Sequence, residues 1–300
     1  MTMSVYLSAL SVTNLISRMP AAVAQGIIWG LMALGVFITF RLLDIPDMTV
    51  DGSFATGGAV TVMLLLAGMP AWAALLIAIV VGVLTGLCTG FLHTKLGIPA
   101  ILAGILTQFA LYSINLRIMG MAANKAVSVD KFSLVLSSRS ISSAILTGAL
   151  IALALVALFY WYFGTEQGSA LRATGSNPNM SAAQGINVNR MKVLGLSLSN
   201  GIVALSGGLM AQYQGFADVN MGRGAIVIGL AAVIIGEVIA RAILGKHLNF
   251  FGTLTFTVIG GVIYYAVVVV VLWLRLNSND LKLFTAVTFL GAKRITCQAF

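Results

Sequence analysis

The chain has 300 residues, of which 59% are hydrophobic and only 8% are charged, and its formal net charge is +9. Soluble domains carry about 25% charged residues, so this composition excludes a soluble globular protein and indicates an integral membrane protein. The basic residues are scattered between apolar runs and form no clustered basic face. This distribution argues against nucleic-acid binding and favours anchoring at the membrane surface by contact with anionic lipids.

Apolar runs long enough to cross a bilayer recur along the chain, since a spanning helix needs about 20 residues. They are Ala21–Phe40, Trp72–Leu92, Ile98–Ile118, Ile141–Phe163, Val193–Tyr213, Ala225–Ala240 and Phe250–Leu274. Two shorter segments, Ser53–Ala67 and Leu281–Leu290, either cross or re-enter from one side. We therefore expect residues 1–300 to form a single all-α transmembrane domain with about eight crossings.

Three glycines within one of these runs, Gly82, Gly86 and Gly90, are spaced by four. Residues at this spacing share one face of a helix, and a strip of glycines lets a neighbouring helix approach closely. The pattern predicts tight helix packing and is common to many membrane bundles.

The second helix of the bundle is expected to be discontinuous. Residues 41–53 read RLLDIPDMTVDGS, and Pro46 both removes a backbone donor and disfavours helix at Ile45. Broken helices in transporters expose backbone groups and helix ends to substrate, which makes Asp51, Gly52 and Ser53 candidates for lining a translocation pathway. Two other interpretations remain open: an ordinary interfacial loop, and Asp51 acting only as the N-cap of the following helix.

Further polar residues lie well inside the apolar runs: Gln25, Gln108, Asn115, Asn200 and Gln212. Amides at such depth either bond neighbouring helices or line a pathway, and we add Gln108, Asn115 and Asn200 to the candidate pathway. Glu237 and Arg241 are four residues apart near the end of a run, which favours a local ion pair over a proton relay.

The longest polar interruption of the chain is the island from Gly164 to Lys192, which contains the signature of a short capped helix. Asn177 is suited to the N-cap, Pro178 to the first helical position, and Gly185 to a left-handed C-terminal cap. A helix over Asn177–Gln184 between two membrane spans is typical of an element presented to a partner.

The sequence contains no phosphate-binding loop and no H-E-x-x-H or G-x-S-x-G motif, and neither its two histidines nor its two cysteines are spaced as metal ligands. We expect no catalytic or metal site. Few ionisable residues lie within the apolar runs, which disfavours a proton- or sodium-coupled carrier and favours energy supplied by a partner protein. A gradient-driven carrier or a channel remains the alternative.

Residues 171–190, LRATGSNPNMSAAQGINVNR, resemble the cytoplasmic coupling loop of ABC-transporter permeases, and more specifically that of the branched-chain amino acid (LivH-like) permeases. The segments WGLMALGV from Trp29, DMTVDGSF from Asp47 and NLRIMG from Asn115 carry the same resemblance, which covers nearly the whole chain. It implies the membrane-spanning subunit of a bacterial importer for an amino acid or similar small solute, located in the cytoplasmic (inner) membrane.

The resemblance also implies partners: two cytoplasmic ATP-binding subunits, an extracytoplasmic substrate-binding protein and a second copy of the permease. ATP would be bound by the partner, so we expect no cofactor in this chain and no enzymatic activity of its own. The loop 164–192 would be cytoplasmic, an orientation that counting basic residues, nine against eight, does not settle. The residues that the resemblance assigns to coupling with the ATPase are Arg172, Asn177, Pro178, Met180, Ala183, Gln184, Gly185 and Arg190.

Two departures from the family pattern stand out. The entry to the loop, YWYFGTEQGSAL, carries little charge, and the final residues, TAVTFLGAKRITCQAF, lack the apolar continuation that the resemblance implies after residue 285. Whether the last segment crosses the membrane is therefore left open.

Overall fold

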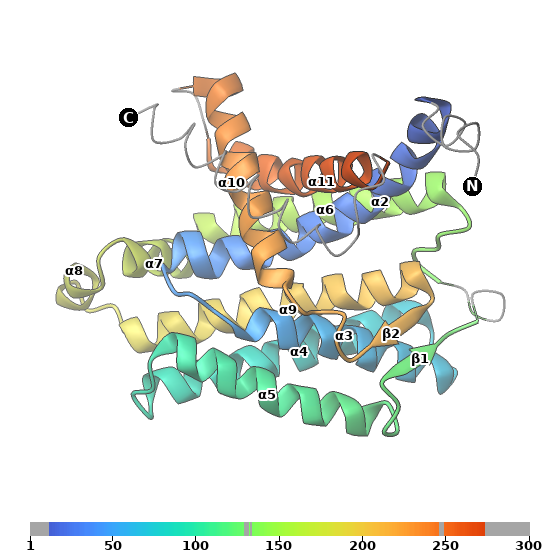
Figure 1. Ribbon diagram of the computed structural model, residues 1–300. Coiled ribbons are helices and arrows are strands. Elements are labelled where there is room, and N and C mark those ends of the chain that lie inside the picture. The colour runs from blue at the N-terminus through green and yellow to red at the C-terminus, as the bar shows by residue number, and fades with distance from the viewer. Residues whose placement is uncertain (1–11, 129–131, 133, 246–248, 274–300) are drawn as a thin grey trace.

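The computed structural model describes residues 12–128, 132, 134–245 and 249–273, and these form a bundle of long helices (Figure 1). The elements in chain order are α2 (Val12–Val36), η1 (Phe37–Leu42), α3 (Thr49–Leu66), α4 (Ala71–Thr94), α5 (Ala100–Ile118), β1 (Asn124–Ala126), α6 (Ile141–Gly164), α7 (Glu166–Ser176), α8 (Pro178–Ala183), α9 (Val188–Gln214), β2 (Phe216–Asp218), α10 (Ala225–Leu244) and α11 (Phe250–Trp273).

Eight helices in the described part of the chain are long and apolar enough to cross a membrane, as the sequence predicts. The segment predicted as Ser53–Ala67 begins earlier, at Thr49, and reaches spanning length. Leu281–Leu290 lies outside the described residues. Length and composition qualify α10 as a span, yet in Figure 1 it crosses the direction of the other long helices and begins beside α3, inside the bundle.

The core of the bundle is made by α2, α3 and α9. In each of these helices, between 78% and 83% of an 18-residue apolar stretch is buried. In the other five candidate spans the buried share of such a stretch is 39% or less. Large apolar side chains stay exposed on the outer helices, among them Leu76 of α4, Leu106 of α5 and Trp161 of α6. In a membrane protein such a surface faces lipid, because lipid chains solvate apolar groups that water would exclude.

The glycine strip of α4 packs against α9, as its spacing predicts. A Cβ on Gly82 would overlap Asn200 and Ala204, one on Gly86 would overlap the carbonyl of Leu196, and one on Gly90 would press on Val193. The two backbones therefore lie too close for a larger side chain between them. This contact holds the first half of α9 in a fixed register against α4.

The predicted break before α3 is present and is shaped by two local features. The last turns of the first span widen into the π-helix η1, and the chain leaves it with Ile45 donating its N–H to the carbonyl of Thr39 over 2.9 Å. Asp44 takes a left-handed backbone conformation with φ of 54°, and Pro46 follows two residues later. The helical axis is thereby interrupted before α3 starts at Thr49.

The two ends of the bundle differ in character. The short helix α8 projects from one end, while β1 and β2 pair as an antiparallel two-stranded sheet at the other (Figure 1). Asn124 pairs with Asp218, so the segment after α5 is joined to the segment after α9. This pairing ties the outer loops together at the end opposite to α8.

Candidate functional site: a coupling end and a polar interior

The helix predicted over Asn177–Gln184 is present as α8, and its caps are the predicted ones. The Asn177 side chain accepts a hydrogen bond from the Met180 N–H over 3.0 Å, Pro178 occupies the first turn, and Gly185 has a φ of 81°. Because a side-chain cap at one end and a left-handed glycine at the other satisfy free backbone groups, six residues hold a helical shape outside the bundle.

Most of α8 is exposed. Ser181 is buried against the rest of the loop, whereas Met180 is 62% exposed and Asn177, Pro178, Ala183 and Gln184 are exposed as well. A protruding, rigid helix with an apolar side chain at its tip is suited to insertion into a groove of another protein. The predicted coupling residues on and beside α8 are therefore all exposed on the same short helix.

Preceding it is a second helix, α7, which the sequence analysis missed. Leu171 of α7 is fully buried, and a Cβ on Gly175 would overlap the carbonyl of Leu42 at the end of η1. The guanidinium carbon of Arg172 lies 5.3 Å from the ring centroid of Phe250 on α11, in cation–π range. The buried Leu171, the close contact at Gly175 and this cation–π contact together pack α7 against the bundle, and α7 supports the base of α8.

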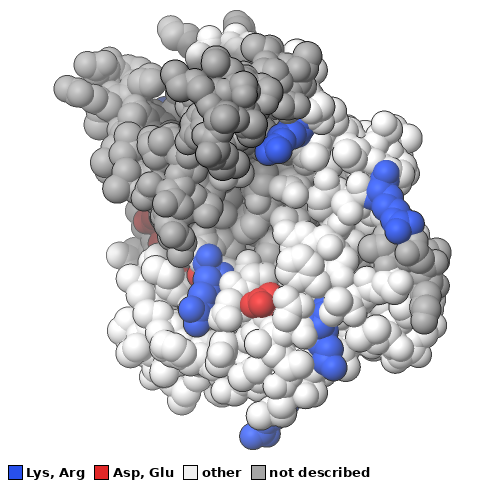
Figure 2. All heavy atoms as spheres, turned by 45° about the vertical axis from the view of Figure 1, so that its right-hand side comes forward, with Lys and Arg blue, Asp and Glu red and all other residues white. Residues whose placement is uncertain are grey.

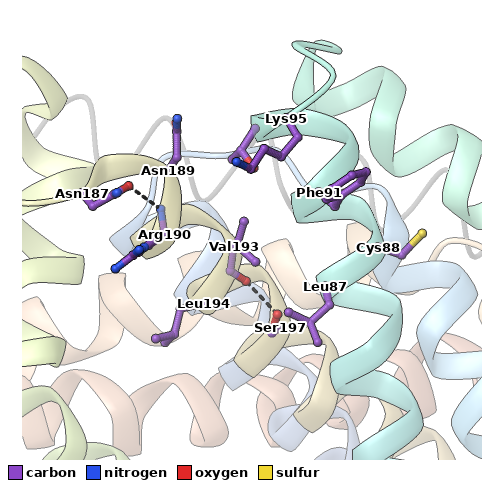
Figure 3. Close-up of a pocket in the computed structure, with 11 residues that line it drawn as sticks. Leu87, Cys88, Phe91, Lys95, Asn187, Asn189, Arg190, Val193, Leu194 and Ser197 are labelled. Atoms are coloured by element: carbon purple, nitrogen blue, oxygen red, sulfur yellow. Dashed lines mark hydrogen bonds between the residues drawn. The ribbon is translucent and has the colours of Figure 1, made fainter.

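Arg190 belongs to the first turn of α9, beside a cavity of about 820 Å³ between the end of α4 and the start of α9. Figure 3 shows Lys95 just past the end of α4 and Val193 and Ser197 on α9, while the Arg190 side chain points away from α4. The Asn187 side chain caps α9 by accepting from the Arg190 N–H over 3.1 Å. Because only residues 184–187 separate α8 from the start of α9, the cavity and α8 lie at the same end of the bundle.

A buried hydrogen-bond network joins the break before α3 to α9 and α4. Asp47, which is 3% exposed, accepts from the Thr49 N–H at Oδ1 over 2.9 Å and from the Asn200 side chain at Oδ2 over 2.7 Å. Ser53 donates to Asn200 Oδ1 over 2.6 Å and lies 2.8 Å from the Thr85 hydroxyl. Two of the predicted pathway residues, Ser53 and Asn200, are thus brought together in the packed interior and line no described cavity.

A row of threonines continues this network towards α5. The hydroxyls of Thr49 and Thr89 lie 2.8 Å apart, and Thr89 donates to Thr107 over 3.0 Å. Sequence reasoning missed Asp47 and the threonines, because a threonine in a helix also bonds its own backbone, as Thr107 does with the Ala103 carbonyl. Buried polar groups of this kind are costly unless paired, so the network fixes one arrangement of the helices.

The carboxyl group of Asp51 caps α10. Its Oδ2 accepts from the Gly224 N–H and its Oδ1 from the Ile226 N–H, each over 2.9 Å. The idea that Asp51 is the N-cap of its own helix was wrong, since α3 begins at Thr49 and the N-cap position is Met48. Sequence spacing cannot show a cap that comes from a residue 173 positions away.

The remaining predicted pathway residues converge on one cavity. Asp51, Gly52, Gln108 and Asn115 all line a space of about 340 Å³ between α3, α5 and the segment that joins β2 to α10. Both amide atoms of Asn115 are buried without a hydrogen-bond partner among the described residues. By contrast, Gln212 bonds the backbone at Val135 and at Ala71, which joins α9 to the segment before α6 and to the first residue of α4.

Glu237 and Arg241 form the predicted local pair, with 3.5 Å between Arg241 Nη2 and Glu237 Oε1. A shorter pair that the sequence did not reveal joins the same oxygen to Arg41 Nη2 over 2.7 Å.

Elsewhere the charged side chains are sparse: on the face in Figure 2 the lysines and arginines stand apart on a mostly uncharged surface.

Comparison with known proteins gives the family. The model of the family "Branched-chain amino acid transport system / permease component" matches residues 19–291. The tyrosine transport system permease protein of Clostridioides difficile (strain R20291) is 40% identical over 272 residues, which cover 90% of this chain and 88% of that protein. The probable branched-chain amino acid transport permease protein LivH of Methanocaldococcus jannaschii is 26% identical over 191 residues, covering 59% of this chain and 60% of that protein.

Among solved structures, PsaBC from Streptococcus pneumoniae in complex with Fab covers 86% of this chain and 95% of that chain, at 14% identity and a TM-score of 0.42. The family match over residues 19–291, the 40% identical relative and the eight apolar helices agree with one another. The chain therefore belongs to the permease components of branched-chain amino acid transport systems, and it is a multi-pass protein of the cytoplasmic membrane.

Proposed function

We propose that the chain is the membrane-spanning subunit of an ABC importer, which moves an aromatic amino acid across the cytoplasmic membrane with energy from ATP hydrolysed by a separate subunit. The observation that carries this proposal is the exposed, capped helix α8, held on a buried base by α7. ATP is bound by the partner, and the chain contributes no cofactor and no catalytic residue of its own.

Coupling in this proposal passes from α8 into α9. Only residues 184–187 separate the two helices, and α9 carries Asn200, which bonds both Asp47 and Ser53 at the break before α3. Asp51 on the same α3 holds the first turn of α10. A displacement of α8 by an ATPase is therefore delivered to α3 and, through Asp51, to α10, by way of short hydrogen bonds.

The substrate class is supported by the relatives. A permease 40% identical over nearly its whole length is named for tyrosine transport, and a more distant one for branched-chain amino acids. Importers of this kind work with two cytoplasmic ATP-binding subunits, an extracytoplasmic substrate-binding protein and a second copy of the permease, and we include all of these in the proposal. The coupling residues are those of α8 with Arg172 and Arg190.

Reconstitution in liposomes tests the proposal. The purified chain alone should hydrolyse no ATP and take up no L-tyrosine, and uptake should appear when an ATP-binding subunit, a substrate-binding protein and ATP are added. Uptake by the chain alone, driven by a proton or sodium gradient, would contradict the proposal and establish the alternative of a gradient-driven carrier.

A further inference from the structure

We propose that the cavity between α3, α5 and the segment joining β2 to α10 is a substrate subsite, in which Arg223 and Asp51 hold the carboxylate and the ammonium group of a zwitterionic aromatic amino acid. This assignment rests on the proposed function and adds the recognition chemistry. The cavity measures about 340 Å³, which lies within the range of sites that hold small molecules.

The cavity has charges of both signs on its wall. Arg223 is exposed, and its guanidinium makes no ion pair with any residue that the structure describes. Asp51 accepts from the Gly224 N–H at Oδ2 and from the Ile226 N–H at Oδ1, and the Ala225 N–H between them also faces its carboxylate. A carboxylate has about four lone-pair positions, so Asp51 retains capacity for an ammonium group. One cation and one anion in a single small cavity match a zwitterion, whereas a simple anion or cation would use only one of them.

The apolar part of the cavity is aromatic. Phe109 and Tyr112 lie three residues apart on α5, so their rings occupy neighbouring positions along the helix. Both are exposed, Phe109 by 71%. Aromatic side chains stack or meet edge to face with other rings, which favours a substrate with an aromatic side chain over an aliphatic one of similar size.

Unused hydrogen-bonding capacity lies in the same wall. Asn115 is 1% exposed, and its amide oxygen and nitrogen both lack a partner among the described residues. Gln108, seven residues earlier on α5, lines the same cavity. Buried amides in native structures are nearly always hydrogen-bonded. A polar ligand or water at this wall would supply the hydrogen bonds that the Asn115 amide lacks among the described residues.

Binding of a ligand series to the purified full-length chain in lipid nanodiscs tests the subsite, with saturation-transfer NMR as the readout. The probes are L-tyrosine, tyramine, which lacks the carboxylate, and 3-(4-hydroxyphenyl)propanoate, which lacks the ammonium group. We expect weak binding of L-tyrosine and a loss of roughly tenfold for each analogue, because each lacks one charge-assisted contact. Absence of L-tyrosine binding, or equal binding of all three, would overturn the proposal.

Arg223→Gln gives the residue-level test. This variant should weaken L-tyrosine binding roughly tenfold and leave tyramine binding unchanged, since tyramine has no carboxylate to lose. Arg117→Gln is the matched control, because Arg117 is an exposed cation on α5 that lines no described cavity. A similar effect of Arg223→Gln on both probes would mean a structural role. The wild-type ligand series stands on its own if the variant fails to fold.

Failure of the subsite is distinguishable from failure of the proposed function. If ATP-dependent uptake requires α8 but is indifferent to Arg223→Gln, the importer stands and the subsite is wrong. If uptake proceeds without any ATP-binding subunit, the proposed function itself is wrong.

Discussion

Asn200 of α9 donates from its side-chain nitrogen to Oδ2 of Asp47 over 2.7 Å, across 153 residues of sequence. Asp47 lies in the break before α3, and Asn200 lies on the helix that follows the exposed helix α8. The contact therefore joins the end of the protein that presents α8 to the interior where the polar residues gather. The same amide accepts from Ser53 of α3, so the Asn200 side chain bonds both the break and the helix that follows it.

Replacing Asn200 by leucine should lower the free energy of unfolding by about 1–3 kcal/mol, because the buried carboxyl group of Asp47 loses the hydrogen bond that the Asn200 amide donates. Thermal unfolding of the purified protein in detergent measures the effect. Ser206→Ala on the same helix is the control: it removes one neutral bond to the Ile28 carbonyl and should cost about 1 kcal/mol or less. Equal losses in the two variants would show that the Asp47 network adds no special stability.

Substitution of Gly57 by alanine should destabilise the bundle by about 1–3 kcal/mol, since a Cβ there would overlap the Ala204 backbone of α9. Gly164→Ala provides the comparison, because no atom lies within 4 Å of the added Cβ at the end of α6. Its unfolding temperature should stay the same or rise slightly. A tolerated Gly57→Ala would mean that α3 and α9 are separated more widely than described.

Glu237→Gln should change the free energy of unfolding by less than about 1 kcal/mol and leave transport intact. Its partner Arg41 is half-exposed, and ion pairs at exposed positions contribute little. Uptake assays and thermal unfolding, run together, check this expectation. Loss of uptake with unchanged unfolding would favour the proton-relay interpretation of Glu237 instead.

Asn177→Ala should remove the N-cap bond to Met180 and cost α8 about 1 kcal/mol of helix stability. Because a docked helix must first be ordered, the affinity for an ATP-binding subunit should fall about fivefold. Asn177→Ser keeps a side-chain oxygen at the cap and should retain most of the affinity. If the two variants bind the partner equally well, the cap plays no part in docking.

Local features of this protein were predictable from sequence, and long-range ones were not. The spans followed from apolar length, and the caps of α8 followed from Asn177, Pro178 and Gly185, because each of these signals acts within a few residues. The partners of Asp47 and Asp51 lie 153 and 173 residues away. No periodicity or spacing encodes such a pairing, which depends on how the helices pack.

The helices α7 and α10 show the same limit of prediction from sequence. The helix α7 lies in a polar segment whose N-cap residue, Thr165, sequence reasoning did not use, and its buried face became apparent only through Leu171 and its contact with the bundle. For α10, apolar length predicted a membrane span but neither its crossing direction in Figure 1 nor the anchoring of its first turn by Asp51. In the candidate pathway, four of six residues share a cavity, and Ser53 and Asn200 serve the buried network instead.

The most direct test of the proposed coupling is co-purification of an ATP-binding subunit with a chain in which residues 177–184 are replaced by a Gly-Ser linker of equal length. Since α7 and α9 make their own buried contacts with the bundle, the variant should unfold at nearly the wild-type temperature. The expected result is a folded permease that no longer retains the ATP-binding subunit or supports ATP-dependent uptake. Retention of the subunit and of uptake at wild-type levels would contradict the role of α8.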